Sequence, residues 1–106
     1  MTIFNMTPHF VSICNADGLI TKDIPPTGNV IRLKTTVVTH GNIDDVRITG
    51  TIFGAAEGLP SYNADVYYIV SQLVKNALPG RNDLLVPAEV VRDTKGNIIG
   101  CQSLGI

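Results

Sequence analysis

The stretch VYYIVSQLVKNALPGRNDLLV, residues 66–86, contains the clearest structural signals in the chain. Its first five residues are all β-branched or aromatic, which is typical of a strand that is covered on both faces. Ser71 is a favourable N-cap, and the apolar spacing after it predicts a helix over residues 72–78 that ends at Pro79-Gly80. A further strand is predicted to begin at residues 84–86. The stretch therefore predicts a strand, one short helix and a second strand.

Short runs rich in Val, Ile, Thr and Phe, separated by turns with Gly or Pro, predict further strands on both sides of this stretch. Residues 29–39 and 46–53 are the longest such pair, and we expect a turn between them at His40-Gly41-Asn42. Residues 54–65 have no clear period and are expected to form a surface loop. The other expected strands are short and cover residues 2–6, 10–14, 19–22, 90–92 and 98–101.

These segments together predict one β-rich α+β domain over residues 1–106. We expect short antiparallel strands that form a curled sheet or a small open barrel with one short helix. The edges of such a sheet have to be covered or paired. The pattern therefore also favours a homo-oligomer, as a dimer or a multiple of dimers.

The composition excludes several classes of protein. The 106 residues carry a formal net charge of −1, and 44% are hydrophobic while only 16% are charged. This balance excludes a disordered chain, and eight scattered basic residues argue against DNA or RNA as a partner. No apolar run approaches the roughly 20 residues of a membrane helix, and the N-terminus lacks the features of a signal peptide. We therefore expect an intracellular protein with no membrane partner.

The two cysteines, Cys14 and Cys101, both lie in apolar stretches. Two are too few for a disulfide framework, so we expect buried reduced thiols, with one disulfide between the first and last strands as the alternative. No Cys-x-x-Cys pair or His-rich cluster is present. We therefore expect neither a metal site nor a cofactor.

The sequence contains no pattern that is typical of a catalytic centre. There is neither a nucleophile elbow nor a glycine-rich phosphate loop. His40 lies in an expected turn, and the ring of His9 could either fix the Thr7-Pro8 loop or contact a ligand. Glu57 and Asp83 could act as acid–base groups, but their spacing does not indicate a pair. We therefore do not expect an enzyme.

Arginines near turns are better candidates for a functional site, because the guanidinium fork suits phosphate groups. Arg81-Asn82-Asp83 could contact phosphate, base and ribose, or the Arg and Asp could simply pair and tie off the loop. Phe53 and Tyr68 could stack on a base, although core packing is the alternative for Tyr68. Arg92 could instead form a surface ion pair with Asp93. The candidate ligand-binding residues are His9, Arg32, Phe53, Tyr68, Arg81, Asn82, Asp83 and Arg92.

The order of several short motifs resembles that of a family of small phage and bacterial proteins. Asn5-Met6-Thr7-Pro8-His9 is similar to the Asn-Leu-Thr-Pro-His opening of that family, with Met6 in place of the leucine. Similar segments follow in the same order at residues 25–28, 32, 53–54, 57–60, 68–71, 81–83, 91–93, 96 and 98–100. The resemblance therefore covers most of the chain, except residues 36–45.

This pattern looks like that of the phage Thoeris anti-defence proteins, which sequester cyclic ADP-ribose-type immune signals without cleaving them. Some members also take up cyclic nucleotides of other defence systems. The resemblance implies a viral protein in the cytoplasm of an infected bacterium. It also implies an oligomer whose nucleotide sites are formed by loops and arginines across a subunit interface. The alternatives are an enzyme that degrades such a signal, and a protein–protein adaptor or inhibitor without a small ligand.

Overall fold

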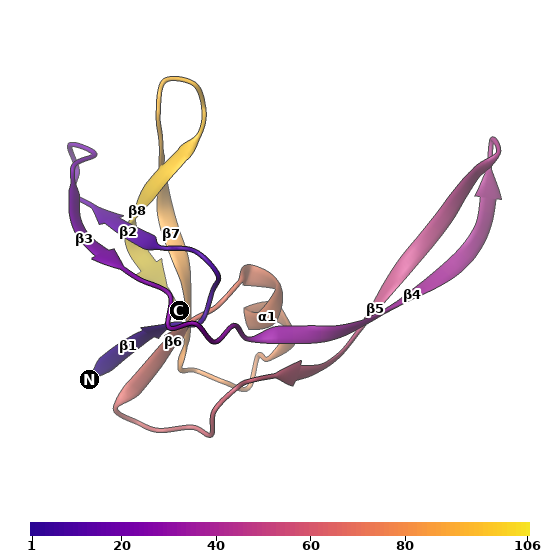
Figure 1. Ribbon diagram of the computed structural model, residues 1–106, viewed down its shortest axis with the longest axis horizontal. Coiled ribbons are helices and arrows are strands. Elements are labelled where there is room, and N and C mark those ends of the chain that lie inside the picture. Colours follow the sequence, from indigo (N-terminus) through magenta and orange to yellow (C-terminus); the bar gives the residue numbers. More distant parts are fainter.

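Six strands form one curled sheet, and a long hairpin projects from it (Figure 1). The computed structural model describes residues 1–106. Every strand that the sequence predicts is present, although those expected at residues 84–86 and 90–92 are one strand. The β-rich α+β class is therefore confirmed. The elements are β1 (Thr2–Asn5), β2 (Val11–Cys14), β3 (Ile20–Ile24), β4 (Arg32–Ile43), β5 (Val46–Glu57), β6 (Val66–Ile69), α1 (Gln72–Ala77), β7 (Leu84–Arg92) and β8 (Ile98–Gly105).

The six-stranded sheet has the order β1-β6-β7-β8-β2-β3 and mixes two kinds of pairing. The pairs β1–β6, β6–β7 and β2–β8 are parallel, whereas β7–β8 and β2–β3 are antiparallel. The parallel pair β6–β7 arises because α1 carries the chain back to the end of the sheet where β6 began. The expected antiparallel arrangement is therefore corrected to a mixed sheet.

Both faces of the sheet are covered at its centre, on β6 and β7. Tyr68, Val70 and Leu84 belong to one buried cluster, and Ile69 and Leu85 belong to another. Successive residues of a strand point to opposite faces, so the two clusters lie on opposite sides of the sheet. This double burial is why residues 66–70 are apolar without interruption.

The helix α1 forms where the sequence predicts it. The Oγ of Ser71 accepts a hydrogen bond from the amide of Val74 at 3.3 Å, which makes Ser71 the N-cap. Val74 is buried against the sheet, and the helix ends just before Pro79-Gly80. The chain contains no helix with the length and apolar character that crossing a membrane requires.

Residues 32–57 form a two-stranded hairpin, here called the arm, that leaves the rest of the chain, here called the body (Figure 1). Its strands β4 and β5 are twelve residues long and pair only with each other. The turn expected at residues 40–42 is wrong, because β4 continues to Ile43 with an irregularity around Gly41. The true turn is Asp44-Asp45, where both φ angles are positive, as tight hairpins require. β5 also continues through residues 54–57, the first part of the expected loop.

The two cysteines are buried and free. Cys14 ends β2 and Cys101 lies on β8, which pairs with β2. Burial raises the pKa of the Cys101 thiol. The structure thus has the two buried free thiols of the first alternative.

Candidate functional site

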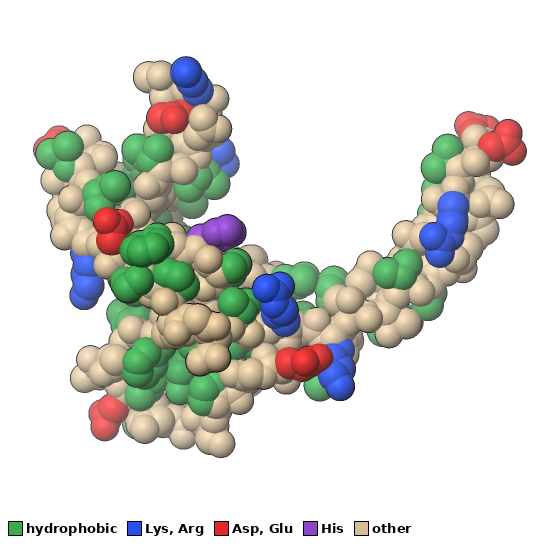
Figure 2. All heavy atoms as spheres, viewed as in Figure 1, with side chains coloured by type: hydrophobic (Ala, Val, Ile, Leu, Met, Phe, Trp, Pro, Cys, Tyr) green, Lys and Arg blue, Asp and Glu red, His purple; other side chains and the backbone are tan.

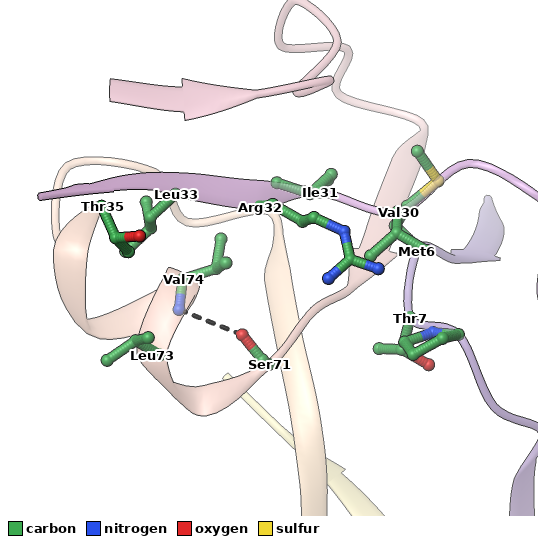
Figure 3. Close-up of a pocket in the computed structure, with 11 residues that line it drawn as sticks. Met6, Thr7, Val30, Ile31, Arg32, Leu33, Thr35, Ser71, Leu73 and Val74 are labelled. Carbon is green, nitrogen blue, oxygen red and sulfur yellow. Dashed lines mark hydrogen bonds between the residues drawn. The ribbon is translucent and has the colours of Figure 1, made fainter. Parts of the chain in front are cut away.

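A groove of about 430 Å³ lies where the arm joins the body (Figure 3). It is formed by the segment 6–8, the segment 30–35 and α1 with its N-cap, which are distant from one another in the sequence. Small-molecule sites usually have volumes of roughly 300–1,000 Å³. The groove is therefore large enough for a ligand of nucleotide size.

The 6–8 wall is held in place by the side chain of Asn5, which is only 1% exposed. Its Nδ2 donates to the carbonyl oxygens of His9 at 2.7 Å and Ile24 at 3.0 Å. Its Oδ1 accepts from the amide of Thr7 at 3.0 Å and from the Thr7 hydroxyl at 2.6 Å. These four bonds, here called the Asn5 clasp, use the full hydrogen-bonding capacity of the amide. The opening motif thus fixes the loop that forms one side of the groove.

Arg32 is the charged residue of the groove. Its side chain extends from the start of β4 into the space between Ser71 and Thr7 (Figure 3). The guanidinium forms no ion pair or hydrogen bond with the protein, although Glu57 lies opposite Arg32 in the strand register. No other lining residue is titratable. An unpaired guanidinium in a groove is suited to bind an anion such as a phosphate.

Hydroxyl groups and apolar side chains complete the lining. Ser71 Oγ accepts from the Val74 amide, so its hydroxyl hydrogen is free to donate to a ligand. Thr35 adds a second hydroxyl, and Leu33 and Leu73 provide apolar walls. The groove therefore offers one positive charge, hydrogen-bonding groups and apolar surface side by side.

Two further predicted site residues lie beside the groove without lining it. Phe53 is the register partner of Thr35, so the two side chains are on the same face of the arm. His9 directly follows Pro8, and its backbone carbonyl takes part in the Asn5 clasp while the residue is exposed. A direct contact of either side chain with a ligand in the groove stays a prediction.

The triplet Arg81-Asn82-Asp83 lies elsewhere. The Arg81 guanidinium donates two hydrogen bonds to the Asp83 carboxylate, at 2.9 and 2.7 Å, and a third to the carbonyl of Pro60 at 3.1 Å. This hydrogen bonding lowers the pKa of Asp83 and raises the pKa of Arg81. Asn82 and Asp83 line a separate hollow of about 150 Å³ with Tyr62. These contacts are those of the loop-tying pair, and a ligand-binding role for the triplet stays a prediction.

The last two predicted residues are also distant from the groove. Tyr68 is buried in the core, and its ring stacks on Phe4 with the ring centroids 6.2 Å apart. Arg92 donates to the carbonyl of Gly96 at 2.8 Å and thereby closes the β7–β8 turn. Of the predicted set, only Arg32 lines the groove, while His9 and Phe53 are neighbours of the lining residues Pro8 and Thr35.

No protein-family model, curated protein or solved structure matches this chain. No three His, Cys, Asp or Glu side chains lie close enough to hold a metal ion. The function has to be argued from the groove and from the resemblance of the short motifs.

Several lining residues are not among the predicted site residues, including Thr7, Leu33, Thr35 and Leu73. Thr7 stands inside the opening motif, which was the available signal. The two leucines and Thr35 carried no signal, because nothing in their local pattern says that they face a concave surface.

Proposed function

We propose that this chain binds a small nucleotide-derived signal, of the cyclic ADP-ribose or cyclic oligonucleotide class, and sequesters it without cleaving it. The protein would then be a viral anti-defence protein that acts in the cytoplasm of an infected bacterium, as the resemblance implies. The observation that carries the proposal is the unpaired Arg32 guanidinium in a groove of suitable size with apolar walls.

The groove supplies the groups that such a ligand needs. A phosphate can accept a two-pronged hydrogen bond from Arg32, and the hydroxyls of Ser71 and Thr35 can bond phosphate or ribose oxygens. Leu73 offers apolar surface for a base, and Phe53 lies on the adjoining strand. Because Arg32 is the one titratable lining group, the groove is better equipped to hold a ligand than to transfer protons.

The test is calorimetry with a panel of cyclic ADP-ribose isomers, cyclic dinucleotides and cyclic trinucleotides. We expect at least one to bind tighter than about 10 μM, which corresponds to roughly −7 kcal/mol. Recovery of the intact ligand after heat denaturation of the complex would support sequestration. Absence of binding at that level across the panel would refute the proposal.

The matched variants are Arg32→Ala and Arg47→Ala. Arg47 lies further along the arm, where its guanidinium bonds Thr39. Loss of a charged hydrogen-bond partner costs roughly 1.5–3 kcal/mol, so Arg32→Ala should weaken binding about 10- to 100-fold while Arg47→Ala leaves it unchanged. Equal effects of the two variants would place the ligand outside the groove.

The same assay separates the alternatives. An enzyme would convert the ligand with time, and His9→Ala would abolish the conversion if His9 were its acid–base group; Glu57 and Asp83 would be tested in the same way. A protein–protein adaptor would show no response to any nucleotide.

A further inference from the structure

The two faces of the arm differ in chemistry. The strand register places Val38, Ile48 and Ile52 on one face, together with the pair Ile43 and Val46 near the turn. We call this the aliphatic face. Ile43, Val46 and Ile52 are 65%, 59% and 57% exposed. A hairpin has no further strand or helix with which to cover such a face.

The opposite face of the arm has more polar side chains, although it also carries Val37 and Phe53, which are 59% and 45% exposed. It carries Thr39, Thr49 and Thr51, and Arg47 donates from Nε and Nη2 to the Thr39 hydroxyl at 3.2 and 2.9 Å. This difference between the faces is that of a sheet with one face toward solvent and one face toward a packing partner. Within a single chain the partner is missing.

The dimensions of the chain show how much more surface it exposes than a compact monomer of the same size. Its radius of gyration is 16.8 Å, whereas a compact domain of this length has about 13 Å. Its accessible surface is 7140 Å², whereas a folded monomer of 11.4 kDa has about 5,800 Å². The excess of about 1,300 Å² is larger than the roughly 800 Å² that each partner buries in a stable complex.

The body has a second uncovered apolar surface. Phe10, Val90, Ile98 and Ile99 surround a hollow of about 270 Å³ between β2, β7 and β8, and no charged residue lines it. All four side chains are at least 40% exposed. Figure 2 shows hydrophobic side chains both along the arm and over the β2–β3 and β7–β8 hairpins. We call this surface the body patch.

We infer that the aliphatic face of the arm docks on the body patch of a second copy of this chain. A second copy is favoured over an unrelated protein because both uncovered surfaces belong to the same chain. Reciprocal exchange of arms covers the aliphatic face and the body patch of each copy in one closed dimer. No charged residue lines the body patch. The aliphatic face also carries His40 beside Gly50 and Lys34 beside Gly54, and the long side chain of Lys34 can keep its ammonium group in water at the edge of the interface.

The first test is the mass in solution by size exclusion with light scattering at tens of micromolar protein. We expect about twice the chain mass of 11.4 kDa. Ile52→Asp should shift the protein to the monomer, whereas Thr51→Asp, on the other face of the same strand, should leave the mass unchanged. A monomeric native chain would overturn the inference, as would a Thr51→Asp variant that dissociates as readily as Ile52→Asp.

The second test does not depend on a destabilising change. Chains carrying Ile52→Cys are mixed with chains carrying Ile98→Cys and oxidised gently; the native cysteines are buried. A disulfide between the two kinds of chain is expected. If Ile52→Cys instead crosslinks only to itself, the arms pack on each other and the body patch is not the docking site.

This inference does not rest on the nucleotide proposal. Calorimetry with Arg32→Ala probes the groove, whereas mass and crosslinking probe the arm. The failure of one therefore leaves the other intact.

Discussion

The body and the arm are built from similar β-branched sequence but are stabilised in different ways. All 14 buried residues of the chain lie in the body, and none lies in residues 32–57. The arm has a long backbone ladder between two strands, with irregularities near Lys34 and Gly41, but no core of its own. The comparison shows that a strand-forming sequence alone does not indicate whether the strand will lie inside the sheet of the body or in a projecting hairpin. The four predictions below test how far the two regions differ.

The largest difference is expected between two asparagines. Asn5→Ala removes the four hydrogen bonds of the clasp and leaves buried carbonyl groups without partners, which should lower the free energy of unfolding by about 3 kcal/mol. Asn42 is exposed on the arm and its side chain makes no hydrogen bond. Asn42→Ala should therefore change the free energy of unfolding by less than about 0.5 kcal/mol. Urea denaturation followed by circular dichroism measures both. Similar losses for the two variants would mean that the arm contributes to the same cooperative core.

A second difference concerns two aspartates. Asp83 is 2% exposed and Arg81 is 22% exposed, so Asp83→Asn leaves a largely buried guanidinium without its counter-ion. We expect a loss of about 2 kcal/mol at pH 7, less than for a fully buried pair because Arg81 retains some contact with water. Asp44→Asn in the turn of the arm should have almost no effect.

The same pair predicts a pH dependence. The pKa of Asp83 is lower in the folded chain than in the unfolded chain because of the hydrogen bonds from Arg81. The stabilisation that ionised Asp83 gives to the folded chain is therefore complete above the pKa that Asp83 has in the unfolded chain. It is lost as the pH falls through the lower pKa that Asp83 has in the folded chain. The difference in the free energy of unfolding between the native chain and Asp83→Asn should be constant from pH 5 to 7 and become smaller below about pH 4. A gap that does not change with pH would contradict an ionic role for Asp83.

The smallest effect is expected in the backbone of the arm. Asp45 has a φ of 62°, so Asp45→Gly should relieve strain and stabilise the hairpin by about 0.5 kcal/mol. Gly41 has a φ of 89°, so Gly41→Ala should destabilise the hairpin by a similar or greater amount. Because the arm has no buried residue, we expect it to open locally while the body stays folded, so hydrogen exchange of the arm amides is the measurement. Protection of the arm amides that rises in Asp45→Gly and falls in Gly41→Ala would support the turn geometry. Protection that changes in the same direction in both variants would contradict it.

The sequence was most informative where local rules decide the structure. Ser71 predicted the start of the helix because capping depends on a few neighbouring residues. The turn of the arm was missed because Asp-Asp is an unusual occupant of two positions with positive φ, whereas His40-Gly41-Asn42 contains the residues that turns prefer. The parallel pairs were missed because a strand carries no local mark of which distant strand it joins.

The candidate site shows the same limit. Arg32 could be selected from its chemistry, since an arginine within an apolar strand is unusual. Its neighbours Thr7 and Ser71 come from segments about 25 and 40 residues away, which only the fold brings together. Arg81 and Asp83 had two interpretations in the sequence, and their mutual contacts are those of the structural one.

The Asn5 clasp has a consequence for how related sequences should be compared. The side-chain amide of Asn5 bonds Thr7 and two backbone carbonyls, so none of its donors or acceptors is left over for a ligand. A shared Asn-x-Thr-Pro-His opening therefore reports that two chains fold their first loop alike. Differences between such proteins in the ligand that they bind should be sought at positions such as 35 and 73, which line the groove but lie outside the shared segments.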